Sequence, residues 1–131
     1  MTEYTMPLDS DEAWSHLRSK SYGRLSVSHD GQPDVFPVNF LADGSTIMFR
    51  SQEGTKLERI DANPRVAFEA DDVTADRVWS VVVKGVAVRM DEASVDAVRM
   101  APFWTWAPEP KDVFIRIRPT EITGRLFNRS H

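Results

Sequence analysis

Three short apolar segments joined by Asp-Gly dipeptides constrain the fold of this chain more than any other feature. Residues 24–29 alternate apolar and polar side chains, which is the two-residue period of a half-buried strand. Asp30 and Gly31 follow directly, and a type I′ hairpin turn favours this dipeptide because both central residues need a positive φ. Residues 33–42 and 46–50 continue the pattern around a second Asp-Gly dipeptide. The sequence therefore predicts an antiparallel meander of three strands.

The remaining segments predict more strands and a few short helices. We expect helices over residues 9–20, 55–62 and 91–101, and strands over residues 65–71, 78–90, 113–118 and 121–127. Gly85 lies inside the longest of these strands, where a glycine often marks a bulge at which a sheet curls. Parallel β-α-β units would need longer helices between most strands. We therefore expect a mainly β (α+β) protein, a closed or partly closed antiparallel barrel formed by residues 1–131 as a single domain.

Composition excludes several classes of protein. The chain has no cysteine, so disulfides, thiolate metal sites and thiol nucleophiles are absent. Its formal net charge of -4 is unfavourable for sequence-independent binding of nucleic acid. No apolar run approaches the roughly 20 residues that span a bilayer, and the N-terminus lacks a signal-peptide pattern. We therefore expect a cytoplasmic protein that binds neither nucleic acid nor membrane.

The segment from Arg50 to Lys56 has the features of a phosphate site. A predicted strand ends at Arg50 and Ser51, a glycine-containing loop follows, and a helix begins at Thr55. A hydroxyl group, free N–H groups of a helix end and two cations are together able to bind a phosphate. Thr55 and Glu58 also have the spacing of a capping box, in which case Thr55 only caps its own helix.

A proline interrupts the second predicted strand, at position 37 of the apolar segment 36–40. Because proline has no N–H to donate, the strand must be bulged or lie on an edge at this point. Either arrangement leaves backbone groups that a ligand could contact, although an ordinary edge strand explains the same pattern.

Aromatic residues gather in two places outside the meander. Trp79 and Ser80 begin the long predicted strand, where Trp79 either fills the core or contacts a ligand. Trp104 and Trp106 lie in a proline-rich loop over residues 102–110, which favours a role in an interface or a pocket. Standard catalytic motifs and local metal-ligand spacings are absent, so we predict no catalytic side chain and no metal site.

The order of these motifs resembles that of the pyridoxamine 5′-phosphate oxidase-like family of flavin-binding split barrels, in particular a compact bacterial branch of it. The resemblance covers nearly the whole chain and runs through residues 22–27, 36–40, 47–51, 54–57, 63–68, 79–85 and 117–125. No single segment is specific to the family, but the ordered set is. The resemblance implies a six-stranded antiparallel split β-barrel that forms a homodimer, with FMN bound in two symmetric clefts between the subunits.

The resemblance also implies which residues bind the cofactor. In the family the phosphate contacts fall on a strand end and the following loop, and the isoalloxazine ring lies along the second strand. The long strand adds polar contacts, and the partner subunit supplies an aromatic cover. The residues implied here are Arg50, Ser51, Thr55 and Lys56 for the phosphate, Pro37, Val38, Asn39 and Phe40 for the ring, Trp79 and Ser80 on the long strand, and Trp106 for the cover.

Three departures from the oxidase proper argue against pyridoxamine 5′-phosphate as the substrate. Thr55 stands where the oxidase has an arginine beside its lysine, and Ser80 stands where it has a glutamine. Residues 121–131 contain no match for its substrate-binding arginine and histidine. Sister families bind a deazaflavin coenzyme or haem, and the acidic balance of this chain disfavours the polyanionic tail of the deazaflavin. We therefore expect FMN, with a deazaflavin coenzyme as the alternative.

The resemblance favours an FMN-dependent oxidoreductase that acts on an unidentified small molecule. The alternatives are a non-catalytic flavin-binding protein that serves storage or sensing, and a deazaflavin-dependent reductase. In flavoenzymes the cofactor carries the hydride chemistry while the protein supplies orientation and electrostatics. The lack of an acid–base residue is therefore compatible with all of these functions.

Overall fold

The computed structural model describes residues 3–99 and 112–129 of the chain. The strands within these residues are β1 (Glu3–Leu8), β2 (Tyr22–His29), β3 (Gln32–Asp43), β4 (Thr46–Ser51), β5 (Arg65–Val73), β6 (Arg77–Arg89) and β7 (Val113–Arg129). The helices are α1 (Ser10–Arg18), α2 (Thr55–Ala62) and α3 (Glu92–Arg99). None of these three helices is long and apolar enough to cross a membrane.

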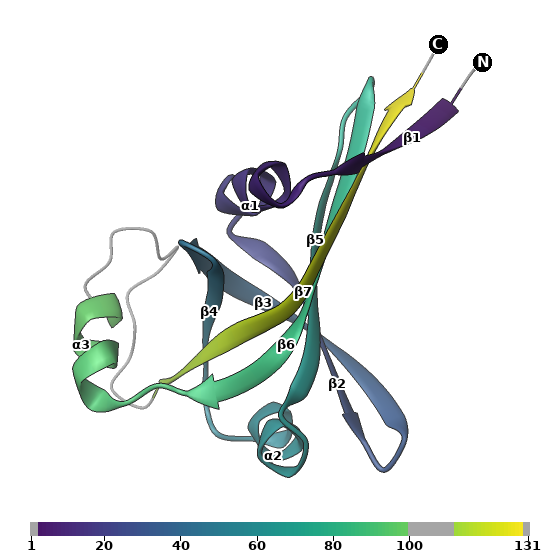
Figure 1. Cartoon of the computed structure of the whole chain (residues 1–131). Helices are drawn as coiled ribbons and strands as arrows, with labels where there is room; N and C mark the ends of the chain where they lie inside the picture. Colours follow the sequence, from purple (N-terminus) through teal and green to yellow (C-terminus); the bar gives the residue numbers. More distant parts are fainter. Residues whose placement is uncertain (1–2, 100–111, 130–131) are drawn as a thin grey trace.

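The seven strands form one antiparallel sheet that closes on itself (Figure 1). The strand order is β1-β7-β4-β3-β2-β5-β6, and β6 returns to pair with β7. One side of β7 pairs with β6, whereas the other side pairs first with β4, over residues 113–117, and then with β1, over residues 124–129. The barrel is split at this change of neighbour. The structure thus confirms the predicted mainly β split barrel and adds β1, which the sequence pattern did not indicate.

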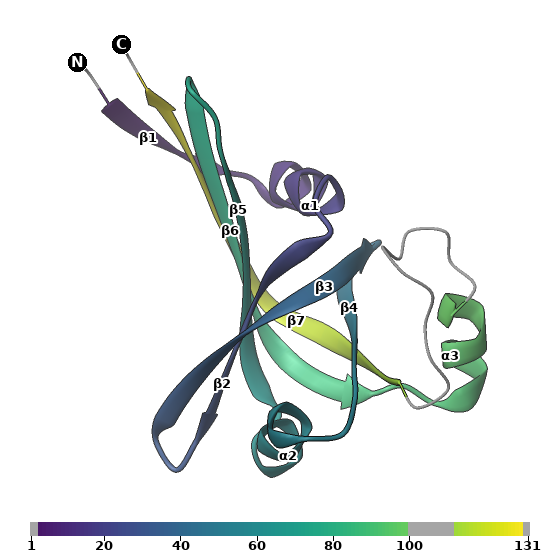
Figure 2. The same ribbon diagram turned by 180° about the vertical axis from the view of Figure 1, so that it is seen from behind.

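Part of the sheet extends beyond the barrel as an arm. Strand β1, the end of β7 and the tips of β5 and β6 run together away from the barrel, and the two chain ends lie on this side (Figure 1 and Figure 2). Helix α2 lies at the opposite end, and α3 follows the far end of β6. Helices α2 and α3 therefore lie away from the arm, whereas α1 lies beside it.

The first Asp-Gly turn forms as predicted, and a capping box begins α1. Asp30 and Gly31, which join β2 to β3, have φ values of 51° and 78°, so both occupy the left-handed region that the hairpin turn needs. The Asp9 and Glu12 side chains accept hydrogen bonds from each other's backbone N–H at 2.8 and 3.1 Å, which completes a capping box at α1.

Helix α1 is shorter than the predicted segment 9–20, and Gly23, which was expected to end it, belongs to β2. A Cβ atom at Gly23 would lie 2.5 Å from the Phe68 ring, so this glycine allows β2 to pack closely on β5. The helix ends at Arg18, and Ser19 forms its C-cap.

The two strands predicted over residues 113–118 and 121–127 are a single strand, β7. Gly85 pairs with Pro119 and Lys84 pairs with Glu121, so Thr120 is the extra residue of a bulge. The bulge accommodates the proline inside a long strand, where the sequence pattern alone indicated a break. Gly85 therefore marks the irregularity that was predicted for it, although the extra residue belongs to the neighbouring strand.

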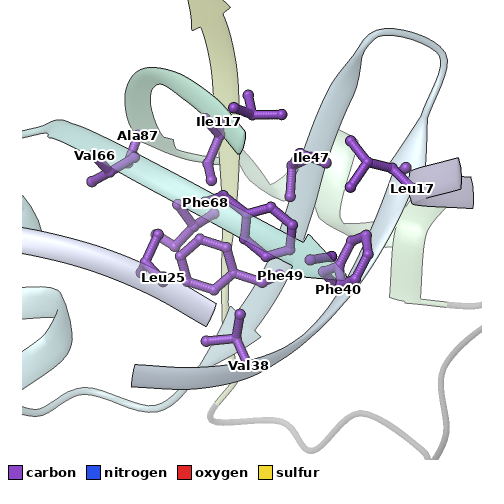
Figure 3. Packing of buried hydrophobic residues seen from close by; sticks show 14 of the residues in the cluster. Leu17, Leu25, Val38, Phe40, Ile47, Phe49, Val66, Phe68, Ala87 and Ile117 are labelled. Carbon is purple, nitrogen blue, oxygen red and sulfur yellow. The ribbon is translucent and has the colours of Figure 1, made fainter. Parts of the chain in front are cut away.

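The barrel interior is filled by large apolar side chains from all sides of the sheet (Figure 3). Phe40 and Phe68 pack edge to face with ring centroids 4.6 Å apart, and Phe49 is fully buried beside them. Helix α2 adds Leu57 and Ile60 to this core, which fixes the helix against the barrel.

The close approach of β6 and β7 at Gly85 generates a stability prediction. A Cβ atom here would lie 2.2 Å from the backbone oxygen of Arg118, so the backbone would have to move. We expect Gly85→Ala to lower the free energy of unfolding by about 1–3 kcal/mol. Thermal unfolding should show this loss as a lower Tm. Lys84→Ala at the neighbouring exposed position is the control and should cost no more than about 0.5 kcal/mol. Equal melting of Gly85→Ala and the wild-type chain would contradict the prediction.

Candidate functional site

A pocket of about 280 Å³ lies between the middle of β3 and the loop that joins β4 to α2. Its walls are formed by Pro37, Val38, Asn39, Arg50, Ser51, Gln52, Lys56 and Asp112. Residues 37–39 and the segment from residue 50 to residue 56 were each singled out in the sequence for separate reasons. The fold brings both segments to one cavity.

Strand β3 is an edge strand where it lines this pocket. Strand β2 pairs with β3 from Gln32 to Asn39, whereas β4 pairs with β3 only from Phe40 onward. Within the described sheet, residues 32–39 therefore have a strand on one side only. Pro37 suits this position because it has no N–H that a neighbouring strand would need. The proline was predicted to mark a bulge or an edge, and the structure shows an edge.

The Lys56 ammonium is held at the pocket by a hydroxyl group and an aromatic ring. Lys56 Nζ donates a hydrogen bond to Ser51 Oγ at 3.0 Å and lies 5.8 Å from the centroid of the Phe36 ring. Burial lowers the Lys56 pKa from its ordinary value. Among residues 3–99 and 112–129, no carboxylate lies within ion-pair distance of this ammonium. The positive charge of Lys56 is thus available to an anion.

Arg50 supplies a second positive charge from the floor of the pocket. Its side chain is only 5% exposed, and its Nη1 atom lies 3.9 Å from Asp112 Oδ2. Arg50 is near the end of β4, directly after the core residue Phe49. The short strand therefore anchors the guanidinium and leaves the loop that follows to carry Lys56.

Thr55 differs from its predicted role as a helix cap. The N-cap of α2 is Gly54, and the first helical hydrogen bond runs from the Glu58 N–H to the Gly54 oxygen at 3.0 Å. The capping box expected from Thr55 and Glu58 does not form, because the helix starts one residue earlier than this box requires. Thr55 is exposed and is not part of the pocket wall.

The other predicted cofactor residues do not line this pocket. Phe40 is buried in the core, and Trp79 is buried beneath α1 with its ring centroid 4.7 Å from that of His16. Ser80 lies on the other face of β6 from Trp79 and pairs with Asp71 and Arg125. Trp104 and Trp106 fall outside the described residues.

Sequence reasoning missed two residues of the pocket wall, Gln52 and Asp112. Gln52 directly follows Ser51, so its place in the loop was a signal that could have included it. Asp112 gave no such signal, because it reaches the pocket only through the pairing of Ser51 with Val113 between β4 and β7.

The fold and the site together define a split antiparallel barrel with a basic pocket beside an edge strand. Residues 9–126 match the family described as pyridoxamine 5′-phosphate oxidase, and the chain belongs to this family. An uncharacterised protein of Mycobacterium tuberculosis is 32% identical over 124 residues, which cover 89% of this chain and 82% of that protein.

Solved structures show the same relationship. A Corynebacterium glutamicum protein provisionally named a pyridoxamine 5′-phosphate oxidase is 37% identical with a TM-score of 0.87, over 96% of this chain and 100% of that chain. An FAD-binding protein from Mycobacterium smegmatis is 39% identical with a TM-score of 0.80, over 96% and 99% of the two chains. An FAD-binding protein from Mesorhizobium loti is 26% identical with a TM-score of 0.80, over 98% and 100%.

The environment of Lys56 generates a prediction about its titration. We expect the pKa of Lys56 to lie below that of an unperturbed lysine, because burial disfavours the ammonium. The cost of this charge to folding is present below the folded-state pKa and is relieved as pH rises through it. An NMR titration of the labelled lysine side chains measures the pKa. Added inorganic phosphate should raise it, whereas an ordinary pKa that does not respond to phosphate would contradict the prediction.

Proposed function

We propose that this chain is an FMN-binding oxidoreductase that acts on a small molecule. The observation that carries the proposal is the pocket in which the open edge of β3 meets the two cations Arg50 and Lys56. The similarity to two FAD-binding proteins, at 39% and 26% identity over nearly the whole chain, supports a flavin as the cofactor. A single pair of cations suits one phosphate group, which supports FMN in particular.

The residues of the pocket suit the two ends of FMN. Lys56 and Arg50 would bind the phosphate, with the Ser51 hydroxyl beside them. The Pro37 carbonyl would contact the polar edge of the ring, since no strand pairs with this residue on that side in the described sheet. The proposed aromatic cover, Trp106, stays a prediction.

A bound flavin supplies the hydride transfer, so the protein has to bind and orient it. The pocket residues would hold the phosphate end in place, and the edge strand would align the ring. A spectrum of the purified protein tests for the cofactor, because flavin, deazaflavin and haem absorb at different wavelengths. If NADH or NADPH reduces the bound flavin and the flavin is reoxidised over repeated turnovers, the result would support an oxidoreductase. A flavin that binds but is not reduced by either donor would favour storage or sensing.

The proposed role of Lys56 and Arg50 predicts how the phosphate contributes to affinity. Lys56→Ala and Arg50→Ala should each weaken FMN more than riboflavin, by about 1.5–3 kcal/mol or about ten- to a hundredfold. Calorimetric titration of both ligands measures this difference, and thermal unfolding checks that the buried Arg50 variant is folded. Arg18→Ala removes an exposed cation from α1 and serves as the control for net charge. Equal losses for FMN and riboflavin would show that these side chains do not contact the phosphate.

We also propose that the protein is a homodimer and that the flavin site is completed at the subunit interface. Tyr22 and Val35 are 51% and 62% exposed, and they lie on β2 and β3 beside the strand segment that lines the pocket. Large apolar side chains next to a binding site suit a surface that a second subunit covers.

The dimer proposal predicts a mass of two chains in light scattering at micromolar concentration, with an interface of about 2,000 Å² or more. Val35→Asp should shift the protein toward the monomer and weaken flavin binding in parallel, because a buried unpaired charge opposes association. Ser45→Asp places the same charge in the exposed turn between β3 and β4 and should leave both properties unchanged. A wild-type monomer would rule out the dimer.

A further inference from the structure

Glu53 is the only acidic residue between positions 51 and 56, the loop proposed to hold the phosphate. Gln52 before it and Lys56 three residues after it line the pocket, but Glu53 does not. The Glu53 carboxylate is directed instead to Arg89 at the end of β6, with Oε1 2.8 Å from Nη1 and Oε2 3.4 Å from Nη2. The negative charge of the loop is therefore paired outside the pocket.

Arg89 is held in place for this contact by a second carboxylate. Its Nε donates to Asp61 Oδ1 at 3.1 Å, and its Nη2 donates to Asp61 Oδ2 at 2.8 Å. Asp61 lies in the last turn of α2, and the arginine holds the pKa of this carboxyl below its ordinary value. The backbone of Arg89 pairs with Ile115 of β7. Arg89 thus joins the start of the loop, the end of α2 and the closed part of the barrel.

Without Arg89, Glu53 would be a competitor for the cations of the pocket. It is exposed, precedes Gly54 and is separated from Lys56 by two residues. An anion tethered this close has a high effective concentration at the ammonium, far above that of a free ligand. Asp112 already lies in the pocket wall, so a second carboxylate there would add to the repulsion of the phosphate.

We propose that Arg89 is a positioning residue for the phosphate subsite, because it keeps the Glu53 carboxylate away from Lys56 and Arg50. For a flavin phosphate this inference rests on the proposed function. The arrangement of charges itself is independent of which anion binds.

The test separates release of the carboxylate from simple loosening of the loop. Arg89→Gln should lower the ratio of FMN to riboflavin affinity at least about fivefold, since a like charge is released beside the phosphate. The double variant Arg89→Gln with Glu53→Gln should restore the ratio to within about twofold of the wild type, since the competing charge is then absent. If Arg89 only ties the loop down, the double variant would stay as weak as the single variant, which would overturn the inference.

Arg59→Gln is the matched control. Arg59 Nη1 lies 3.2 Å from Asp34 Oδ2 and holds α2 against β3, so its loss removes a tie on the same helix without releasing a carboxylate of the loop. The affinity ratio should remain unchanged in this variant. An equal loss in Arg59→Gln would show that any loosening of α2 is sufficient, and this result would also overturn the inference.

A readout without flavin keeps this inference distinct from the proposed function. In the ligand-free protein, Arg89→Gln should raise the pKa of Lys56 in an NMR titration, because Glu53 then approaches the ammonium, and the double variant should return it. If the wild-type protein does not prefer FMN to riboflavin, the proposed function fails while this titration still decides the role of Arg89. An unchanged Lys56 pKa in Arg89→Gln would overturn the inference.

Discussion

The antiparallel pairing of β6 with β7 closes the barrel. Both strands of this pair also position parts of the candidate site. The first half of β7 holds β4 on its other side, which places Arg50 and Ser51 opposite Phe114 and Val113 and brings Asp112 to the pocket. The end of β6 carries Arg89, which reaches the loop after β4. The bulge between these strands lets one long strand serve two different neighbours, first β4 and then β1.

The pocket exists because β4 is short and its pairing with β3 ends at Phe49. Phe49 pairs with Phe40, so the preceding residues of β3 are left with an open edge. The chain then turns into α2, whose residues Leu57 and Ile60 are buried in the core. The same burial that stabilises the helix positions Lys56 across from the open edge. Core packing and the proposed binding of an anion are thus parts of one arrangement.

Features with a local physical cause could be predicted from the sequence. The turn at Asp30, the capping box at Asp9 and the edge at Pro37 each follow from a backbone requirement of a few residues. Strand β1 could not be predicted in this way, because its partner β7 lies at the other end of the chain. Residues 119 and 120 were left between two predicted strands, because the bulge that joins these strands forms opposite Gly85, which is distant in the sequence.

The difference between local signals and long-range pairing also explains which site residues could be predicted. The pocket contains residues 37–39 together with Arg50, Ser51 and Lys56, which lie in two nearby segments whose sequences carry their own signals. Phe40 and Trp79 were taken from the family pattern, and their burial in the core depends on which way each strand faces. Asp112 reaches the pocket only through long-range strand pairing, for which the sequence has no local signal.

The open edge of β3 also bears on how the protein avoids aggregation. Phe40 donates its N–H to Ser21, toward β2, so the odd-numbered positions from residue 33 to residue 37 direct their backbone nitrogens to the open side. Pro33 and Pro37 are two of these positions, and neither has a hydrogen to donate. A strand from a neighbouring molecule would therefore find an incomplete set of donors along this edge, which disfavours intermolecular sheet growth. The carbonyl groups of Pro33 and Pro37 face the same side and can accept hydrogen bonds from a small ligand.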